Sequence, residues 1–305
     1  MGAQRHVWRA AAVLVAALAL VWPAGGALAR EGELTGTLRK AEASGRVTIG
    51  YRESSIPFSY LGGGKAPIGY SIDLCQEIVD EMARAIGRER LDILYKPVTS
   101  ETRFSAIQSG EVDLECGSTT ANVERRQFAD FSPVIYVSAT KLLVPRGSPI
   151  KSYRDLGGRT VIATAGTTNE GAVRALVQRL AIAAKVTTGR DHAESYRAVK
   201  DGKADALALD DVLLYGLIAA DGADGAKFQV LPDDLSYEPY GIMFARNDPG
   251  MATLVTAAFQ RLAASREIRW IYERWFLKRL PNGERLNIPA SEQLMGIWQM
   301  EGLPD

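Results

Sequence analysis

The sequence contains few of the residues from which metal centres and nucleophilic active sites are built. Its 305 residues include two cysteines and two histidines, and none of them has the paired spacing of a zinc site. A G-x-S-x-G motif is absent, so a serine hydrolase would have to use His192 as its base without the usual nucleophile turn. The glycines at 62–64 lack the lysine and Ser/Thr of a phosphate-binding loop, and no dinucleotide-binding fingerprint occurs. We therefore expect no metal and no cofactor, and an enzyme is poorly supported.

An excess of charge of one sign is also missing. The 36 Lys and Arg residues balance 36 Asp and Glu residues, so nothing indicates the basic surface that a nucleic acid or an anionic membrane would require. The one long apolar run covers residues 10–22, which is shorter than the roughly 20 residues that span a bilayer. Arg5 and Arg9 precede it and Ala-Leu-Ala follows at 27–29, a pattern typical of a secretory signal peptide.

Residues 1–29 are therefore predicted to be removed on export. No cysteine follows the apolar run, so we expect no lipid anchor, and the bacterial periplasm fits this pattern best. In an oxidising compartment Cys75 and Cys116 are expected to form a disulfide, although two separate buried thiols are the alternative.

Short β-rich runs alternate with amphipathic helical patterns along the rest of the chain. The sequence predicts strands at 47–51, 91–95, 112–115, 160–163 and 204–209, and helices at 71–86, 169–180, 194–200 and 249–264. This alternation predicts an α/β fold with two mostly parallel sheets, because a βαβαβ pattern occurs at 47–116 and again at 160–210.

Two extended apolar segments, 134–145 and 240–246, are predicted to cross between the two sheets. The first lobe would then comprise residues 34–138 and 246–305, and the second lobe residues 139–245. Two lobes joined by two segments form a hinge, and hinged lobes close around ligands. The segment from 281 to 305 is expected to wrap on the first lobe, with a short helix at 291–300.

Polar side chains gather where the predicted strands end. Because ligands bind beyond the carboxyl ends of parallel strands, these residues are the candidate site. They are Arg52, Ser100, Arg103, Ser118, Thr120, Arg125, Thr168, His192 and Asp210. Donors dominate the set, since three arginines accompany a single clear carboxylate. Such a set suits a small ligand that carries two anionic groups and one cationic group.

Each of these residues also has a simpler explanation. Arg52 could be a solvated loop charge, Ser100 and Asp210 could cap helices, and His192 could be an exposed first-turn residue. Arg103 is more informative. With Ser100 as the helix cap it would lie three residues into the helix, where the dipole disfavours a cation unless an anion lies nearby. Of the neighbours Arg125 and Arg126, one is expected to be solvated.

Eight segments together closely resemble the family 3 extracellular solute-binding proteins, in particular the glutamate/aspartate-binding branch. They are RESSIPFSY at 52–60, GYSIDLC at 69–75, TSETR at 99–103, ECGSTTANVERR at 115–126, AGTTNE at 165–170, RDHAESYR at 190–197, ALDDVLL at 208–214 and EPYGIMF at 238–244. The resemblance implies a two-lobe periplasmic-binding-protein fold of type II. It also implies that the lobes close on L-glutamate or L-aspartate and deliver it to the permease of an ABC importer.

The resemblance further implies a role for each candidate residue. Arg125, Thr120 and the amides around Thr168 would hold the α-carboxylate, while Asp210 and the region of Ser118 would hold the ammonium group. The residues that would bind the second carboxylate are Arg52, Ser100, Arg103 and His192. Three arginines against Asp210 give a formal charge of +2, before His192 is counted. The chain departs from the branch at Asn169, where serine is more usual.

A second function class stays open at this point. Periplasmic arogenate/prephenate dehydratases resemble these receptors, but they would need a pocket for a ring-bearing substrate and a positioned general acid. The complete group of residues for a second carboxylate favours a receptor, which we expect to be a monomer. The sequence leaves open the preference between glutamate and aspartate and whether asparagine or glutamine also binds.

Overall fold

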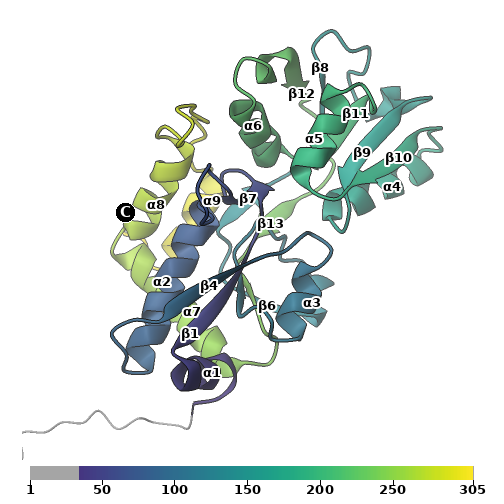
Figure 1. The fold of residues 1–305 in the computed structure, drawn as a ribbon. Helices are drawn as coiled ribbons and strands as arrows, with labels where there is room; N and C mark the ends of the chain where they lie inside the picture. Colours follow the sequence, from purple (N-terminus) through teal and green to yellow (C-terminus); the bar gives the residue numbers. More distant parts are fainter. Residues whose placement is uncertain (1–33, 305) are drawn as a thin grey trace, which may run out of the picture. The chain divides into compact units, whose positions relative to one another are not determined.

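A computed structural model describes residues 34–304, so the predicted signal peptide lies outside the described residues. Residues 34–304 contain two five-stranded sheets with helices packed against them (Figure 1). In spatial order the first sheet consists of β4 (Asp92–Pro97), β1 (Arg46–Tyr51), β5 (Leu114–Glu115), β14 (Met243–Phe244) and β6 (Asp130–Phe131). The second consists of β10 (Lys185–Gly189), β9 (Thr160–Thr164), β11 (Ala206–Asp210), β8 (Thr140–Pro145) and β12 (Phe228–Val230).

The parallel half of each sheet is the predicted βαβαβ unit. In the first sheet β1 pairs in parallel with β4 and β5, and in the second sheet β9 pairs in parallel with β10 and β11. The connecting helices are α2 (Tyr70–Ala85), α3 (Arg103–Gln108), α4 (Thr168–Arg179) and α5 (His192–Lys200). The other strands of both sheets pair antiparallel, and they come from segments near the crossings between the sheets.

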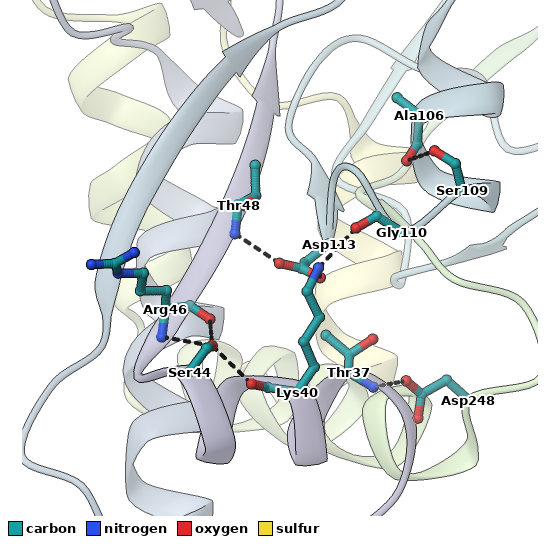
Figure 2. Close-up of polar contacts among 10 residues, drawn as sticks. All are labelled: Thr37, Lys40, Ser44, Arg46, Thr48, Ala106, Ser109, Gly110, Asp113 and Asp248. Carbon is teal, nitrogen blue, oxygen red and sulfur yellow. Dashed lines mark hydrogen bonds and ion pairs between the residues drawn. The ribbon is translucent and has the colours of Figure 1, made fainter.

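An aspartate in front of the third strand fixes both units in the same way. Asp113 precedes β5, and its carboxylate accepts hydrogen bonds from the Thr48 amide at 2.8 Å and from Lys40 Nζ at 2.7 Å (Figure 2). Asp205 precedes β11 and accepts from the Thr160 amide at 2.7 Å. Asp113 thereby ties β5 to β1, and Asp205 ties β11 to β9, at the amino ends of these strands. The two strands therefore reach the opposite edge of the sheet side by side.

Strands β7 (Tyr136–Ser138) and β13 (Glu238–Tyr240) pair antiparallel between the two sheets (Figure 1). The chain enters the second sheet at β8, directly after β7. The chain returns to the first sheet at β14, which begins three residues after the end of β13. The predicted lobe limits at 138 and 245 stay a prediction, and β14 lies just before the second limit. The short strands β2 (Ser54–Ser55) and β3 (Ser59–Tyr60) form a separate hairpin.

The C-terminal helices pack around the first sheet and the crossing strands. They are α7 (Pro249–Ala264), α8 (Glu267–Phe276) and α9 (Glu292–Met300), and α1 (Gly36–Ser44) lies beside α7. Trp298 of α9 is buried against the ring of Tyr272, 5.4 Å between centroids. The remaining helix of the second sheet is α6 (Asp211–Ala220), and 3-10 turns lie at Arg125–Gln127, Tyr153–Leu156 and Gly225–Lys227.

The predicted disulfide is confirmed, since Cys75 of α2 is bonded to Cys116 directly after β5. None of the helices within 34–304 is both long and apolar enough to cross a membrane. In the same part of the chain no three His, Cys, Asp or Glu side chains come together as a metal site would require.

Candidate functional site

The nine candidate residues come together where the strand ends of the two sheets face each other. Eight of them line one small cavity of about 10 Å³, which Thr167, Asn169 and Leu213 complete. Arg52 is the exception. It lies directly behind this cavity, where its Nη2 donates to Ser100 Oγ at 2.7 Å. All nine are buried except Thr168, which is half-buried. An open groove over Phe104 and Phe128 continues from the cavity at Arg125 and Thr168.

The three arginines enter the site from the first sheet. Arg52 is 2% exposed, so the alternative of a solvated loop charge is wrong. Arg103 donates from Nη1 to Thr119 Oγ1 at 2.7 Å, and Arg125 donates from Nη1 to the Thr120 carbonyl at 3.2 Å. Arg103 and Arg125 both also reach the carbonyl oxygen of Gly166, at 3.5 and 3.4 Å. These two guanidinium groups therefore converge on a single acceptor from the second sheet.

Burial leaves the arginines charged but incompletely paired. It lowers the pKa of Arg52 to about 10 and that of Arg125 to about 9, with the repulsion from Arg103 adding to both shifts. Arg52 Nη1 and Arg103 Nε have no hydrogen-bond partner among the described residues. An unpaired buried donor is costly, so these groups are ready to accept an anionic ligand.

One local detail differs from the sequence-based expectation, and another agrees with it. Helix α3 begins at Arg103 after Thr102, so Ser100 does not cap it and instead accepts the hydrogen bond from Arg52. Of the two neighbouring arginines, Arg125 is the buried one and Arg126 is exposed, with its guanidinium 5.4 Å from the centre of the Phe131 ring. Ser100 and Arg125 thus belong to the cavity.

His192 and Ser118 add neutral groups to the cavity. His192 is buried, so an exposed first-turn position is wrong, and its Nδ1 lies 2.8 Å from Thr164 Oγ1. Burial and the charges of Arg52 and Arg103 hold the pKa of His192 well below its usual 6.5. The imidazole is therefore neutral at pH 7. Ser118 Oγ has no partner among the described residues.

Asp210 closes the opposite side of the cavity. Its Oδ1 accepts from Asn169 Nδ2 at 2.6 Å, and its Oδ2 accepts from the hydroxyl of Tyr240. It makes no side-chain hydrogen bond to cap α6. Burial, and then the negative charge of Glu238, raise the pKa of Asp210 to about 7. The carboxylate is thus held by two donors and would become more acidic beside a cation.

Sequence reasoning missed two buried carboxylates. Glu115 Oε2 accepts from Thr119 Oγ1 at 2.6 Å, and Glu238 Oε2 accepts from Thr120 Oγ1 at 2.6 Å. They are 0% and 2% exposed. The charge of +2 that Asp210 alone implied is therefore wrong, because three carboxylates face three arginines. Both glutamates stand in the motif segments, but only the fold places them beside the cavity.

The edges of the two sheets already touch around the cavity. Ala193 N donates to Ser54 Oγ at 3.3 Å. Gly216 of α6 lies so close to Ile56 that a Cβ there would overlap the Ile56 carbonyl oxygen. Both contacts join the segment after β1 to helices that follow strands of the second sheet.

Comparison with known proteins agrees with this arrangement. Residues 47–278 match the family model of the bacterial extracellular solute-binding proteins, family 3. The chain is 41% identical over 272 residues to the L-glutamate/L-aspartate-binding protein of Pseudomonas aeruginosa, covering 86% of this chain and 87% of that protein. It is 33% identical over 264 residues to the glutamate/aspartate import solute-binding protein of Salmonella typhimurium, with the same coverage.

Solved structures share the fold. An ancestral amino acid-binding protein, a precursor of cyclohexadienyl dehydratase, has a TM-score of 0.67 at 26% identity and covers 79% of this chain and 99% of its own. An ancestral arginine-binding protein bound to glutamine has a TM-score of 0.68 at 24% identity, covering 77% of this chain and 99% of its own. The dehydratase lineage is thus only a distant structural neighbour, and the sequence relatives are named as binding proteins. The chain belongs to the bacterial extracellular solute-binding proteins of family 3.

Proposed function

We propose that this protein is a periplasmic receptor that binds L-glutamate or L-aspartate between its lobes and delivers it to an ABC importer. The observation that carries the proposal is the convergence of Arg103, Arg125 and Asp210 in one cavity, with Arg52 directly behind it. Two separate cationic positions and one carboxylate match an amino acid that bears two carboxylates and one ammonium group. The names of the similar proteins point to the same ligands.

The α-carboxylate would bind at Arg125 and the start of α4. Arg125 now donates to two backbone carbonyls, those of Thr120 and Gly166, which a carboxylate would replace as stronger acceptors. The first amides of α4, at Thr168 and Asn169, have no acceptor inside the helix, and both residues line the same cavity, whereas the Glu170 amide is capped by Thr167. Thr120 would contribute through its backbone, because its hydroxyl already donates to Glu238.

The second carboxylate would bind at Arg52, Ser100, Arg103 and His192. Arg52 Nη1 and Arg103 Nε supply N–H groups without partners. If the Thr164 hydroxyl donates to His192 Nδ1, the neutral ring carries its proton on Nε2 and becomes a further donor. The ammonium group, which is on the same carbon as the α-carboxylate, would bind at Asp210 and Ser118 in the same cavity.

The cellular setting is part of the same proposal. We infer export by the signal peptide at 1–29 without a lipid anchor, a monomeric receptor, and closure of the lobes 34–138 plus 246–305 and 139–245. The dehydratase alternative is not favoured, since the sequence relatives at 41% and 33% identity are named as binding proteins and the dehydratase precursor is only a structural neighbour at 26% identity.

Titration calorimetry with a panel of amino acids tests the proposal directly. L-glutamate and L-aspartate should bind to the same site, whereas L-glutamine should bind much more weakly because it leaves two arginines without an anion. Formation of phenylpyruvate from prephenate is the matching assay for the enzyme alternative. Tight binding of neutral or basic amino acids alone would overturn the proposed ligand class.

A further inference from the structure

Glu238 is a buried carboxylate that has no cation within ion-pair distance among the described residues, although Arg125 and Arg103 lie within its electrostatic reach. It opens strand β13, opposite Ser138 of β7, and is 2% exposed. Within 34–304 it takes part in no ion pair, whereas a buried carboxylate is normally paired with a cation. Hydroxyl groups surround it instead. Thr120 and Thr168 donate to its Oε2 at 2.6 and 2.7 Å, and Ser236 donates to its Oε1 at 2.5 Å.

These contacts fix the direction of two hydroxyl groups that line the cavity. Thr120 comes from the loop after β5 of the first sheet and Thr168 from the start of α4 in the second. A threonine hydroxyl has a single proton, and a carboxylate oxygen can only accept. Once both protons point at Glu238, both hydroxyl oxygens can offer only lone pairs to a ligand. Lone pairs suit an ammonium group and repel a carboxylate.

A chain of hydrogen bonds links Glu238 to Asp210. Asn169 Nδ2 contacts both Asp210 Oδ1 and Thr140 Oγ1 at 2.6 Å, and Ser236 Oγ lies 2.6 Å from Thr140 Oγ1. Ser236 has a single hydroxyl proton, and the two acceptors within its reach are Glu238 Oε1 and Thr140 Oγ1. Glu238 also contributes to the raised pKa of Asp210, which places the two carboxylates within each other's electrostatic reach.

We propose that Glu238 is a positioning residue that turns Thr120 and Thr168 into acceptors and thereby, together with Asp210, selects a ligand with an ammonium group. The inference rests on the proposed amino-acid ligand and adds the way in which the ammonium group is recognised. Glu238 does not need to touch the ligand. It acts through the two threonines, one from each sheet, and so couples ammonium recognition to the closed arrangement of the sheet edges.

The test compares L-glutamate with glutarate, which has both carboxylates but no ammonium group. Binding of both is measured by calorimetry and by displacement at millimolar ligand, in the wild type and in Glu238→Gln and Glu238→Ala. Each variant should lose about ten- to a hundredfold in affinity for L-glutamate. The hydroxyl oxygens of Thr120 and Thr168, which would accept from the ammonium group, would become weaker acceptors or be free to rotate. Affinity for glutarate should stay the same or rise.

The ratio of the affinities for L-glutamate and glutarate separates a positioning role of Glu238 from a purely structural one. Equal losses for L-glutamate and glutarate would show that Glu238 merely holds the strands, and would overturn the inference. If the Glu238 variants fail to fold, Thr120→Val and Thr168→Val provide the second route, since each deletes a hydroxyl that Glu238 orients. They should lower the L-glutamate/glutarate ratio too, and an unchanged ratio refutes the inference. A wild type that binds neither glutamate nor aspartate would instead overturn the proposed function, and this inference with it.

Discussion

Replacing Arg103 by alanine should nearly abolish binding of acidic amino acids and leave the fold intact. Arg103 is 2% exposed and donates from Nη1 to Thr119 Oγ1, which in turn donates to Glu115. Its Nε has no partner within the described part of the chain, and this is the group we expect to meet the ligand's second carboxylate. The alanine variant would leave that carboxylate beside Arg52 alone.

The expected loss is large because the pair is desolvated. Removing one partner of a buried charge pair typically costs about 2–5 kcal/mol, which corresponds to a loss in affinity of roughly thirtyfold to several thousandfold. Arg103→Lys should fall between the wild type and Arg103→Ala, since lysine keeps the charge but lacks the planar fork. The loss should be much smaller for a ligand without a second carboxylate, such as L-alanine, if that ligand binds measurably.

Calorimetry with L-glutamate measures the effect, and the melting temperature of the ligand-free variant reports on the fold. Arg126→Ala is a matched control, because Arg126 is an exposed arginine next to Arg125 in sequence and its guanidinium stacks over the Phe131 ring. Its glutamate affinity should stay within about twofold of the wild type. An Arg103→Ala protein that folds normally and binds glutamate as well as the wild type would refute the assignment of the second-carboxylate site.

Three further predictions concern pH, the disulfide and the close contact of the sheet edges. Since the pKa of Asp210 is about 7 without ligand and an ammonium group would lower it, glutamate affinity should fall by up to about tenfold per pH unit below pH 7. The same raised pKa means that Asp210 contributes stability to the ligand-free protein at low pH, and that this stability is lost as the pH rises toward 7. A flat binding profile from about pH 5 to pH 8 would contradict this prediction. The unreduced, unfolded protein should show no free thiol from Cys75 and Cys116, and reduction of this bond, which spans 41 residues, should destabilise the fold by about 3–4 kcal/mol. Gly216→Ala should lower the thermal stability, since a Cβ at this position would overlap the Ile56 carbonyl oxygen, which outweighs the small gain in helix propensity. It should also weaken glutamate binding severalfold, because its Cβ would meet the Ile56 carbonyl when the lobes close. Small-angle scattering should therefore show less compaction with ligand than in the wild type. Unchanged affinity would argue against closure through this contact.

The fold could be predicted from sequence because hydrophobic periodicity is a local signal. The helix predicted at 71–86 spans Tyr70–Ala85, and the strand predicted at 160–163 spans Thr160–Thr164. The antiparallel strands β6 and β14 were not predicted as strands of the first sheet. Each has only two residues, and each exists because it pairs with a distant segment. Such long-range pairing leaves no periodic trace in a short run.

The site was predictable in its residues and less so in their environments. Nine residues were selected because they follow strand ends, and the sheets bring all of them to one place. Burial was harder to predict. Arg52 and His192 each allow an exposed position when only neighbours in sequence are considered, yet both are 2% exposed. Their burial depends on packing between the two sheets, which single-sequence patterns do not encode.

The missed carboxylate Glu115 changes how selectivity for an acidic ligand is explained. With Glu115, Glu238 and Asp210 facing three arginines and His192 neutral, the empty site lacks the large positive excess that the sequence indicated. Such balance makes the burial of the arginines tolerable without ligand. Selectivity for glutamate over glutamine then has to come from the unpaired donors Arg52 Nη1 and Arg103 Nε. The side-chain NH₂ of glutamine is itself a donor, so it would face these donors without forming a hydrogen bond.

This explanation predicts opposite effects of Glu115→Gln on the empty and the occupied site. The variant keeps an acceptor for Thr119 Oγ1 but removes the negative charge that supports Arg52 and Arg103. The ligand-free protein should therefore melt at a lower temperature, because two buried guanidinium groups lose a counter-charge. Glutamate should restore more stability than it adds to the wild type, because its carboxylate replaces that charge. Melting curves with and without L-glutamate measure both effects. An equal ligand-induced shift in the two proteins would show that Glu115 does not compensate the arginines, and selectivity would then have to be attributed to the net charge of the site after all.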